Sequence, residues 1–196
     1  MREVELKSVV PDPDGAVAAL REAGAALAFD GRLRDARYDT PEGALTARDQ
    51  VLRIRVFDGA PAPHASLDWK GPTGLDRGYK VRDEFSTGVS DAGALAHILD
   101  GLGYVVVREI DRRVAQFECR GATVRLERYP RMDALIEVEG EPAAIEAAIA
   151  ATRLPRVGFT AERLRDFVVR FEARTGERAA LCDRELAGDY RYPADA

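Results

Sequence analysis

The sequence has few of the residues that build disulfide-rich or zinc-binding proteins. Among its 196 residues there are two cysteines and two histidines. Two cysteines are too few for a disulfide framework. With only two histidines as well, a zinc site of the usual Cys/His spacing is improbable. A basic excess is also missing, because 29 lysines and arginines stand against 34 acidic residues, for a formal net charge of −5. General nucleic-acid binders usually carry such an excess, so this class is disfavoured.

Long apolar runs and a phosphate-binding glycine loop are absent as well. No run of apolar residues is long enough to span a membrane as a helix. The first ten residues, MREVELKSVV, alternate in polarity and carry charge, unlike a signal peptide. The glycines between positions 71 and 78 lack the spacing of a P-loop. These absences favour a cytoplasmic protein with no membrane partner.

Alternation between apolar and charged residues marks most of the expected strands. In the segment 2–9, Glu3, Glu5 and Lys7 fall on one face, and Val4 and Leu6 fall on the other. A period of two predicts a β-strand. Similar patterns predict strands at 51–57, 65–70, 79–87, 104–108, 112–119, 123–129 and 135–139. A longer segment, 25–39, also has strand character, with a break expected at residues 30–31.

Helices are expected between these strands, and the chain should end in a mobile tail. Asp12 and Pro13 have the residue types that begin a helix, and Gly24 is placed to end it. Apolar residues at helical spacing predict further helices near 91–102, 142–151 and 161–174. The last of these carries Arg163, but interleaved acidic residues favour a solvated face. The polar end of the chain suggests a domain over 1–175 and a mobile tail over 176–196.

Charge on the expected strands is segregated by sign. The first and last strands carry acidic pairs, whereas the strands between them are mainly basic, and the opposite faces are apolar. A polar sheet face is often simply solvated. If the sheet closes into a barrel, however, the charged faces line its lumen. Clustered carboxylates then favour a hard divalent cation, and clustered arginines and lysines favour phosphate.

Several segments together resemble the CYTH proteins, also called triphosphate tunnel metalloenzymes. The segment EVELK (residues 3–7) is similar to the ExExK motif of that family. In the same order follow LRIR (52–55), LDWKGP (67–72), YKVRDEF (79–85), DRRVAQF (111–117) and VRLERYPRMDALIEVEG (124–140). The Lys-Gly-Pro sequence after Trp69 is most similar to the class IV adenylyl cyclase branch. The resemblance extends over roughly residues 1–175.

The resemblance implies an α+β fold, an eight-stranded antiparallel β-barrel with helices packed outside it. It also implies that the lumen binds Mg²⁺ or Mn²⁺, as two ions, and a nucleoside or inorganic triphosphate. The metal-binding carboxylates would be Glu3, Glu5, Glu84, Glu127, Glu137 and Glu139. The triphosphate-binding cations would be Lys7, Arg53, Arg55, Lys70, Lys80, Arg82, Arg113 and Arg125, of which Lys7, Lys70 and Arg113 are the catalytic candidates.

Two positions differ from the family pattern, and the activity stays open between alternatives. Glu127 stands where the family usually has aspartate, and Arg125 is an additional cation on the same face. Adenylyl cyclase activity on ATP is the first expectation, because of the Trp-Lys-Gly-Pro sequence. Hydrolysis of inorganic or thiamine triphosphate is the alternative, and a non-catalytic polyphosphate-binding module is a third possibility. Relatives of this type often pair, and an exposed barrel wall would permit a homodimer.

Overall fold

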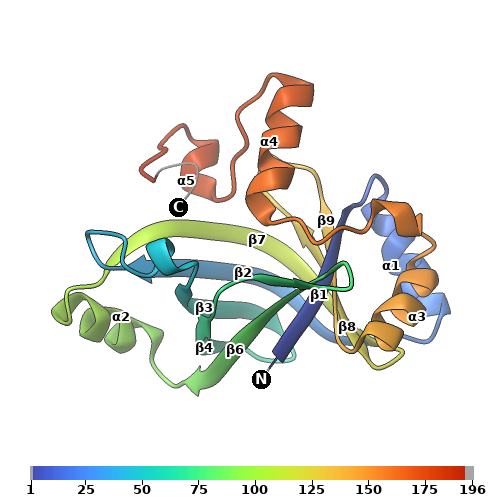
Figure 1. Ribbon diagram of the computed structural model, residues 1–196, viewed down its shortest axis with the longest axis horizontal. Coiled ribbons are helices and arrows are strands. Elements are labelled where there is room, and N and C mark those ends of the chain that lie inside the picture. Colours follow the sequence, from blue (N-terminus) through green and yellow to red (C-terminus); the bar gives the residue numbers. More distant parts are fainter. Residues whose placement is uncertain (1, 193–196) are drawn as a thin grey trace.

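The computed structural model describes residues 2–192, and its centre is a closed antiparallel barrel (Figure 1). Eight strands hydrogen-bond in the order β1-β9-β8-β7-β2-β3-β4-β6, and β6 pairs back with β1. The strands are β1 (Arg2–Val9), β2 (Ala26–Asp39), β3 (Val51–Ala60), β4 (His64–Lys70), β6 (Tyr79–Val89), β7 (Val105–Cys119), β8 (Ala122–Arg128) and β9 (Leu135–Glu139), while β5 (Gly74–Asp76) adds only to β6. The expected eight-stranded antiparallel barrel is confirmed.

The helices lie outside the barrel, where they cover apolar faces of the strands. They are α1 (Pro13–Glu22), α2 (Ala92–Gly101), α3 (Pro142–Thr152), α4 (Leu164–Thr175) and α5 (Asp183–Leu186). The Asp12 carboxylate accepts a hydrogen bond from the Gly15 amide, and Pro13 lies in the first turn, which explains where α1 begins. Figure 1 shows α1 and α3 together against the end of the barrel that contains β1 and β8.

The main apolar core lies between these two helices and the outer faces of β1, β7, β8 and β9. Leu20 of α1 and Ile145 of α3 are fully buried there, together with Phe117 and Val124 from the barrel. The outward faces of these strands are therefore apolar because they are covered. Their inward faces are left to carry the charged residues, as the sequence predicted.

Strands β2 and β7 are longer and less interrupted than expected. They pair from Ala26 to Asp39, so residues 30–31 continue β2, and residues 105–119 form one strand. Gly31 is needed for close contact with β3, because a Cβ atom there would lie 2.4 Å from the carbonyl oxygen of Asp58. This glycine therefore marks a tight strand pairing, and the expected break is absent.

The chain after α4 returns to the barrel. Ala180 and Leu181 are buried, and the backbones of Ala180 and Arg131 form two hydrogen bonds, of 2.8 and 3.1 Å. The side chain of Arg184 pairs with Glu109 of β7. Part of the segment that we expected to be a mobile tail thus packs on the barrel, because the apolar residues 179–182 are buried there. Residues 193–196 lie outside the described part of the chain.

No helix among residues 2–192 is long and apolar enough to cross a membrane.

Candidate functional site

The lumen of the barrel contains a charged cavity of about 580 Å³. It extends from the inner faces of the strands to the turn at residues 46–51 and the start of α4. Among the described residues that line it, cations outnumber acids by twelve to five. The cations are Lys7, Arg37, Arg48, Arg53, Arg55, Lys70, Lys80, Arg82, Arg108, Arg112, Arg163 and Arg165, and the acids are Glu5, Asp35, Asp49, Glu127 and Glu137. Such a cavity is suited to a polyanion.

Strand order explains why the acidic residues of distant segments meet. β1 lies between β6 and β9, and Glu5 is directly opposite both Lys80 of β6 and Glu139 of β9. Glu3 of β1, Glu84 of β6 and Glu139 of β9 each offer a carboxylate oxygen, and these three atoms all lie within 4.8 Å of one another. This group, the Glu3–Glu84–Glu139 cluster, unites three of the six predicted metal-binding carboxylates.

Glu3 is a carboxylate with only one of its two oxygens paired, Oε1 with Lys70. It is buried, and its Oε2 atom has no hydrogen-bond partner among the described residues. Burial, followed by repulsion from Glu5, raises the pKa of Glu3 from 4.5 to about 7, although Lys70 opposes the shift. A cation bound at the cluster would supply the missing charge and coordinate the unpaired oxygen. The all-oxygen donor set suits Mg²⁺ or Mn²⁺, so the residues present fit the metal that the sequence suggested.

Lys70 occupies the same region of the lumen. Its Nζ atom pairs with Glu3 and lies 2.9 Å from Oε2 of Glu84. Although burial raises the pKa of Glu84, the charges of Lys70 and Arg53 hold it below its usual value. Lys70 therefore neutralises the cluster in part, and a divalent ion would compete with it for the same oxygens.

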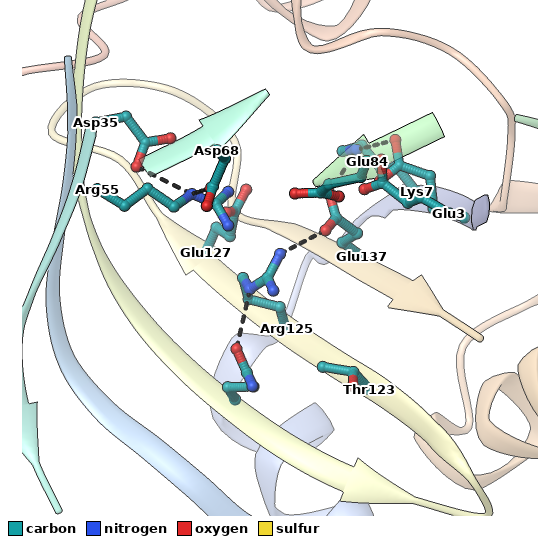
Figure 2. A network of polar contacts seen from close by, with 12 residues as sticks. Glu3, Lys7, Asp35, Arg55, Asp68, Glu84, Thr123, Arg125, Glu127 and Glu137 are labelled. Carbon is teal, nitrogen blue, oxygen red and sulfur yellow. Dashed lines mark hydrogen bonds and ion pairs between the residues drawn. The ribbon is translucent and has the colours of Figure 1, made fainter. Parts of the chain in front are cut away.

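Glu5 and Glu137 lie beside the cluster and are held by cations. Lys7 Nζ is 2.7 Å from Glu5 Oε1 and 2.5 Å from Glu137 Oε2, and Lys80 also pairs with Glu5. Arg125 donates from Nη1 to Glu137 Oε1 at 2.6 Å and, more weakly, from Nε to Gln116 (Figure 2). Burial and Glu137 raise the pKa of Glu5, but Lys7 and Lys80 outweigh them and lower it to about 2. Both carboxylates are therefore ionised and paired.

Arg53 and Arg55 of β3 lie beside the buried carboxylates of Asp35 and Asp68, and Arg53 also reaches to 3.5 Å from Glu84 of the cluster. Arg53 Nε donates to Asp68 Oδ2 at 2.9 Å, and Arg55 lies between Asp35 and Asp68 at 3.4 and 3.5 Å (Figure 2). Asp68 also accepts a 2.6 Å hydrogen bond from Ser86. Buried carboxylates thus orient both guanidinium groups toward the cavity.

Glu127 lies on this arginine-rich side and outside the Glu3–Glu84–Glu139 cluster (Figure 2). Its Oε1 accepts from Arg112 Nε at 2.9 Å, and its Oε2 accepts from the hydroxyl of Tyr129. Arg112 Nη1 is also 3.2 Å from Asp35. The structure therefore places Glu127, which we predicted to bind metal, where it positions an arginine.

Arg113, the predicted catalytic and phosphate-binding residue of β7, lies on the outer face of the barrel and is exposed. Its neighbour Arg112 is the residue that points into the lumen and lines the cavity. Consecutive residues of a strand face opposite sides, so a one-residue error in register exchanges the two. The structure thus does not bring Arg113 into the lumen, and Arg112 occupies the inward position that we predicted for Arg113.

Arg82 reaches the rim of the cavity, where it is half-buried. Its guanidinium donates to the carbonyl oxygen of Gly71 at 2.8 Å and to that of Asp49 at 3.1 Å. Asp49 in turn accepts hydrogen bonds of 2.8 Å from the Thr73 amide and from Arg163 at the start of α4. Arg82 thus connects β6 with the turn that borders the cavity.

Several cavity residues were not identified from the sequence. Asp35 and Arg37 of β2 and Arg108 of β7 line the cavity, and Asp68 of β4 is buried behind it, where it pairs with Arg53. The inward position of Arg37 leaves its Nε atom buried without a hydrogen-bond partner among the described residues, and burial, then Arg53, lowers its pKa to about 10. β2 carries arginines on both faces, so alternation could not show which of them face inward.

Arg163 and Arg165 correct a second expectation. Both line the cavity, although we expected this helix to have only a solvated charged face. Each remains exposed toward the solvent on one side. Since α4 begins at the mouth of the barrel, its first charged residues border the cavity. The solvated charged face that we expected is confined to residues further along the helix.

A small apolar cluster lies in the lumen next to the arginines. Phe57 lies two residues beyond Arg55 on β3, and it clusters with Phe29 and Leu33 of β2 and Val114 of β7. Leu33 and Val114 are almost completely buried. On β2, β3 and β7 the inward residues therefore change from charged to apolar just beyond Asp35, Arg55 and Arg112.

A closed antiparallel barrel with a cation-lined lumen and a carboxylate cluster defines the class of protein. The CYTH domain model matches residues 1–154, and the chain therefore belongs to the CYTH domain family. None of the curated proteins matches the chain in sequence.

Solved structures share the fold. A candidate adenylate cyclase from Vibrio parahaemolyticus has a TM-score of 0.71 at 20% identity, covering 85% of this chain and 97% of that one. A protein from Pyrococcus horikoshii OT3 has a TM-score of 0.69 at 23% identity, covering 86% and 98%. A candidate adenylyl cyclase from Hippeastrum, whose dominant activity is that of a triphosphatase, has a TM-score of 0.59 at 17% identity, covering 91% and 98%. At these identities the likeness extends to the fold alone.

Proposed function

We propose that this protein is a divalent-metal-dependent enzyme that acts on a nucleoside triphosphate, with conversion of ATP to cyclic AMP and pyrophosphate as the first candidate reaction. The observation that carries the proposal is the presence, in one lumen, of the Glu3–Glu84–Glu139 cluster and a cavity lined by twelve cations. The carboxylates favour a hard cation, and the arginines and lysines favour phosphate oxygens. A metal–triphosphate complex satisfies both groups at once.

Each group has a distinct role in this proposal. The Glu3–Glu84–Glu139 cluster holds an ion, and Glu5 and Glu137 are the carboxylates left for the second ion that the family resemblance implies. Arg53, Arg55 and Arg112 hold the triphosphate, since buried carboxylates already orient them. When bound, the metal would polarise a phosphoryl oxygen and neutralise charge that develops as the bond breaks.

Lys70 would change partners when the substrate binds. It now pairs with Glu3 and Glu84, the oxygens that an ion would take. An ion at the cluster would leave the ammonium group without these partners, and a phosphate oxygen in the cavity would replace them. Lys70 is thereby a candidate for stabilising negative charge on the leaving group.

Two reactions fit this arrangement. In a cyclase the ribose 3′-hydroxyl attacks the α-phosphorus, and pyrophosphate leaves. In a triphosphatase water attacks the terminal phosphorus, the bond from this phosphorus to the bridging oxygen breaks, and the diphosphate part leaves while orthophosphate is formed. The sequence Trp69-Lys70-Gly71-Pro72 supports cyclisation, whereas the dominant triphosphatase activity of the Hippeastrum protein, which has the same fold, keeps hydrolysis as the second candidate.

The products identify the reaction. The protein should be incubated with ATP, tripolyphosphate or thiamine triphosphate, each with Mg²⁺ or Mn²⁺, and the products separated by chromatography. Cyclic AMP and pyrophosphate from ATP are the expected result. Orthophosphate without cyclic AMP would show that the protein hydrolyses ATP and does not cyclise it. Ligand-induced stabilisation without turnover of any substrate would indicate a binding module and contradict the enzymatic proposal.

A further inference from the structure

Two residues of β8 differ in charge, and each lies directly opposite one glutamate of β9. Thr123 is paired with Glu139, and Arg125 is paired with Glu137 (Figure 2). The hydroxyl of Thr123 donates to Glu118 at 3.1 Å, so it brings no charge to Glu139. Arg125, in contrast, is a permanent cation, because a guanidinium group does not lose its proton in proteins. β8 therefore leaves Glu139 available to the Glu3–Glu84–Glu139 cluster but neutralises Glu137.

The two carboxylates that remain for a second ion are already paired with cations. Both oxygens of Glu137 are occupied, since Oε1 accepts from Arg125 at 2.6 Å and Oε2 lies 2.5 Å from Lys7 Nζ. Oε1 of Glu5 pairs with Lys7 and with Lys80. Two negative charges thus face three positive ones, and all five side chains are almost completely buried. A divalent ion at this place would be repelled, because buried like charges are poorly screened.

Arg125 is fixed by the neighbouring strands on both sides. It lies opposite Gln116 of β7 as well as Glu137 of β9, and its Nε donates to Gln116 at 3.3 Å. Its residue is only 8% exposed, and it is not among the described residues that line the charged cavity. The guanidinium group therefore acts on Glu137 and does not face a ligand in the cavity.

The Glu3–Glu84–Glu139 cluster has oxygens that an ion can use. Three carboxylate oxygens lie within 4.8 Å of one another, and Oε2 of Glu3 has no hydrogen-bond partner among the described residues. One ion can contact all three side chains. The lumen thus offers one place where oxygens are available and a second place where protein cations already hold them.

We propose that Arg125 takes the place of a second metal ion, so that the lumen binds one divalent ion, at the Glu3–Glu84–Glu139 cluster. This inference rests on the proposed function and narrows its metal requirement, since the family resemblance implies two ions. The guanidinium group supplies fixed positive charge beside Glu137. It has no open coordination position, so Arg125 neutralises charge but does not activate an attacking oxygen as a bound ion does.

The test is the number of Mn²⁺ ions bound by the full chain, measured by equilibrium dialysis. Wild type should bind one ion tightly and a second ion at least about a hundredfold more weakly. Arg125→Gln removes the charge and keeps a side chain that can donate to Glu137. This variant should bind the second ion at least about tenfold more tightly than wild type does.

EPR spectroscopy shows where a second ion binds. Ions of a two-metal site lie about 4 Å apart, close enough to broaden each other's Mn²⁺ spectrum. Ions on separate surface carboxylates lack this broadening. Arg125→Gln loaded with two ions should therefore show the broadened spectrum, and wild type at the same Mn²⁺ concentration should not.

Arg125→Lys is the matched control, because it keeps a positive charge at the same position and should bind one ion, as wild type does. Thermal unfolding without Mn²⁺ checks that each variant is folded. Glu137→Gln is a second variant that leaves Arg125 intact. Since Glu137 is paired with Arg125 and Lys7, this change should weaken the first ion less than Glu139→Gln does.

The outcomes separate this inference from the proposed function. Two ions of similar affinity in wild type would overturn the inference and leave the proposed function standing. So would a folded Arg125→Gln variant whose second ion binds no more tightly than in wild type. If Arg125→Gln does not fold, an equal loss of the first ion in Glu137→Gln and Glu139→Gln would overturn the inference. Failure of wild type to bind any Mn²⁺ would overturn both.

Discussion

Glu3 shows how the environment of one residue sets the chemistry of the lumen. Burial and the nearby Glu5 raise its pKa to about 7, so near neutral pH the metal-free carboxyl is protonated in about half of the molecules. Bound metal requires the ionised form, and metal therefore has to displace this proton. The pKa of Glu84, in contrast, lies below its usual value because Lys70 and Arg53 outweigh the effect of burial. Of Glu3 and Glu84, Glu3 is therefore the residue whose protonation couples metal binding to pH.

The first prediction concerns this coupling. Below a pKa of about 7 the metal competes with a proton on Glu3, and above it the site is already ionised. Apparent Mn²⁺ affinity should therefore rise about tenfold between pH 6 and pH 8 and then level off. Calorimetric titration at several pH values measures it. An affinity that is constant over this range would show that Glu3 does not exchange a proton for the ion.

The second prediction separates the carboxylate cluster from acidic residues in general. Glu139→Gln removes one charge from the Glu3–Glu84–Glu139 cluster, and Mn²⁺ affinity should fall by at least about tenfold. Glu141→Gln is the matched control, because Glu141 is exposed at the start of α3. It should bind Mn²⁺ as wild type does, and equal losses in the two variants would refute the assignment of the cluster.

The third prediction uses adjacent arginines that face opposite sides of β7. Arg112→Lys removes the planar guanidinium between Glu127 and Asp35, and tripolyphosphate should bind about tenfold more weakly. Arg113→Lys changes an exposed residue on the outer face and should leave binding unchanged. Thermal unfolding checks that both variants remain folded. A larger effect at Arg113 would restore the assignment made from the sequence.

At the scale of elements, the strands show what a sequence pattern can determine. β1 and β9 alternate cleanly, so the inward positions of Glu3, Glu5, Glu137 and Glu139 could be predicted. β7 contains two adjacent arginines in a strand with charge on both faces, and alternation does not show which one is inside. β2 has the same ambiguity, which concealed Asp35. The pairing of β2 and β7 with their neighbouring strands decides which of their residues face the lumen. This pairing follows from the closure of the barrel.

The C-terminal segment could not be placed from its composition. Its main apolar run, Ala179–Cys182, is too short to show a period, and its partners, Arg131 and Asp111, lie far away in the sequence. Only the folded barrel presents the surface that this segment covers. The same limitation applies to Arg165, because its role depends on where α4 begins relative to the mouth of the barrel.

The fourth prediction tests how firmly this segment is bound. Leu181 is buried in an apolar cluster with Ile110 and Phe167. Leu181→Ala should lower the free energy of unfolding by about 2–4 kcal/mol, which corresponds to a fall in Tm of about 8 °C. Leu186→Ala should have a much smaller effect, because Leu186 is 46% exposed. Equal Tm values for Leu181→Ala and wild type would indicate that the segment does not stay docked.

At the scale of the molecule, the net charge conceals the character of the interior. The chain has a formal charge of −5, yet cations dominate the lining of its cavity. Acidic residues lie on the surface or in the lumen, where they orient arginines or form the candidate metal site. A bulk acidic excess is therefore compatible with a site for a strongly anionic ligand. The homodimer stays a prediction, since no structural observation bears on it.

The central claim is that one lumen binds a divalent metal and a triphosphate together. Its most direct test is calorimetric titration of the full chain with tripolyphosphate, in the presence and absence of Mn²⁺. The cationic lining and the Glu3–Glu84–Glu139 cluster predict that Mn²⁺ strengthens binding by about tenfold or more. Absence of tripolyphosphate binding, or equal affinity with and without Mn²⁺, would contradict the account.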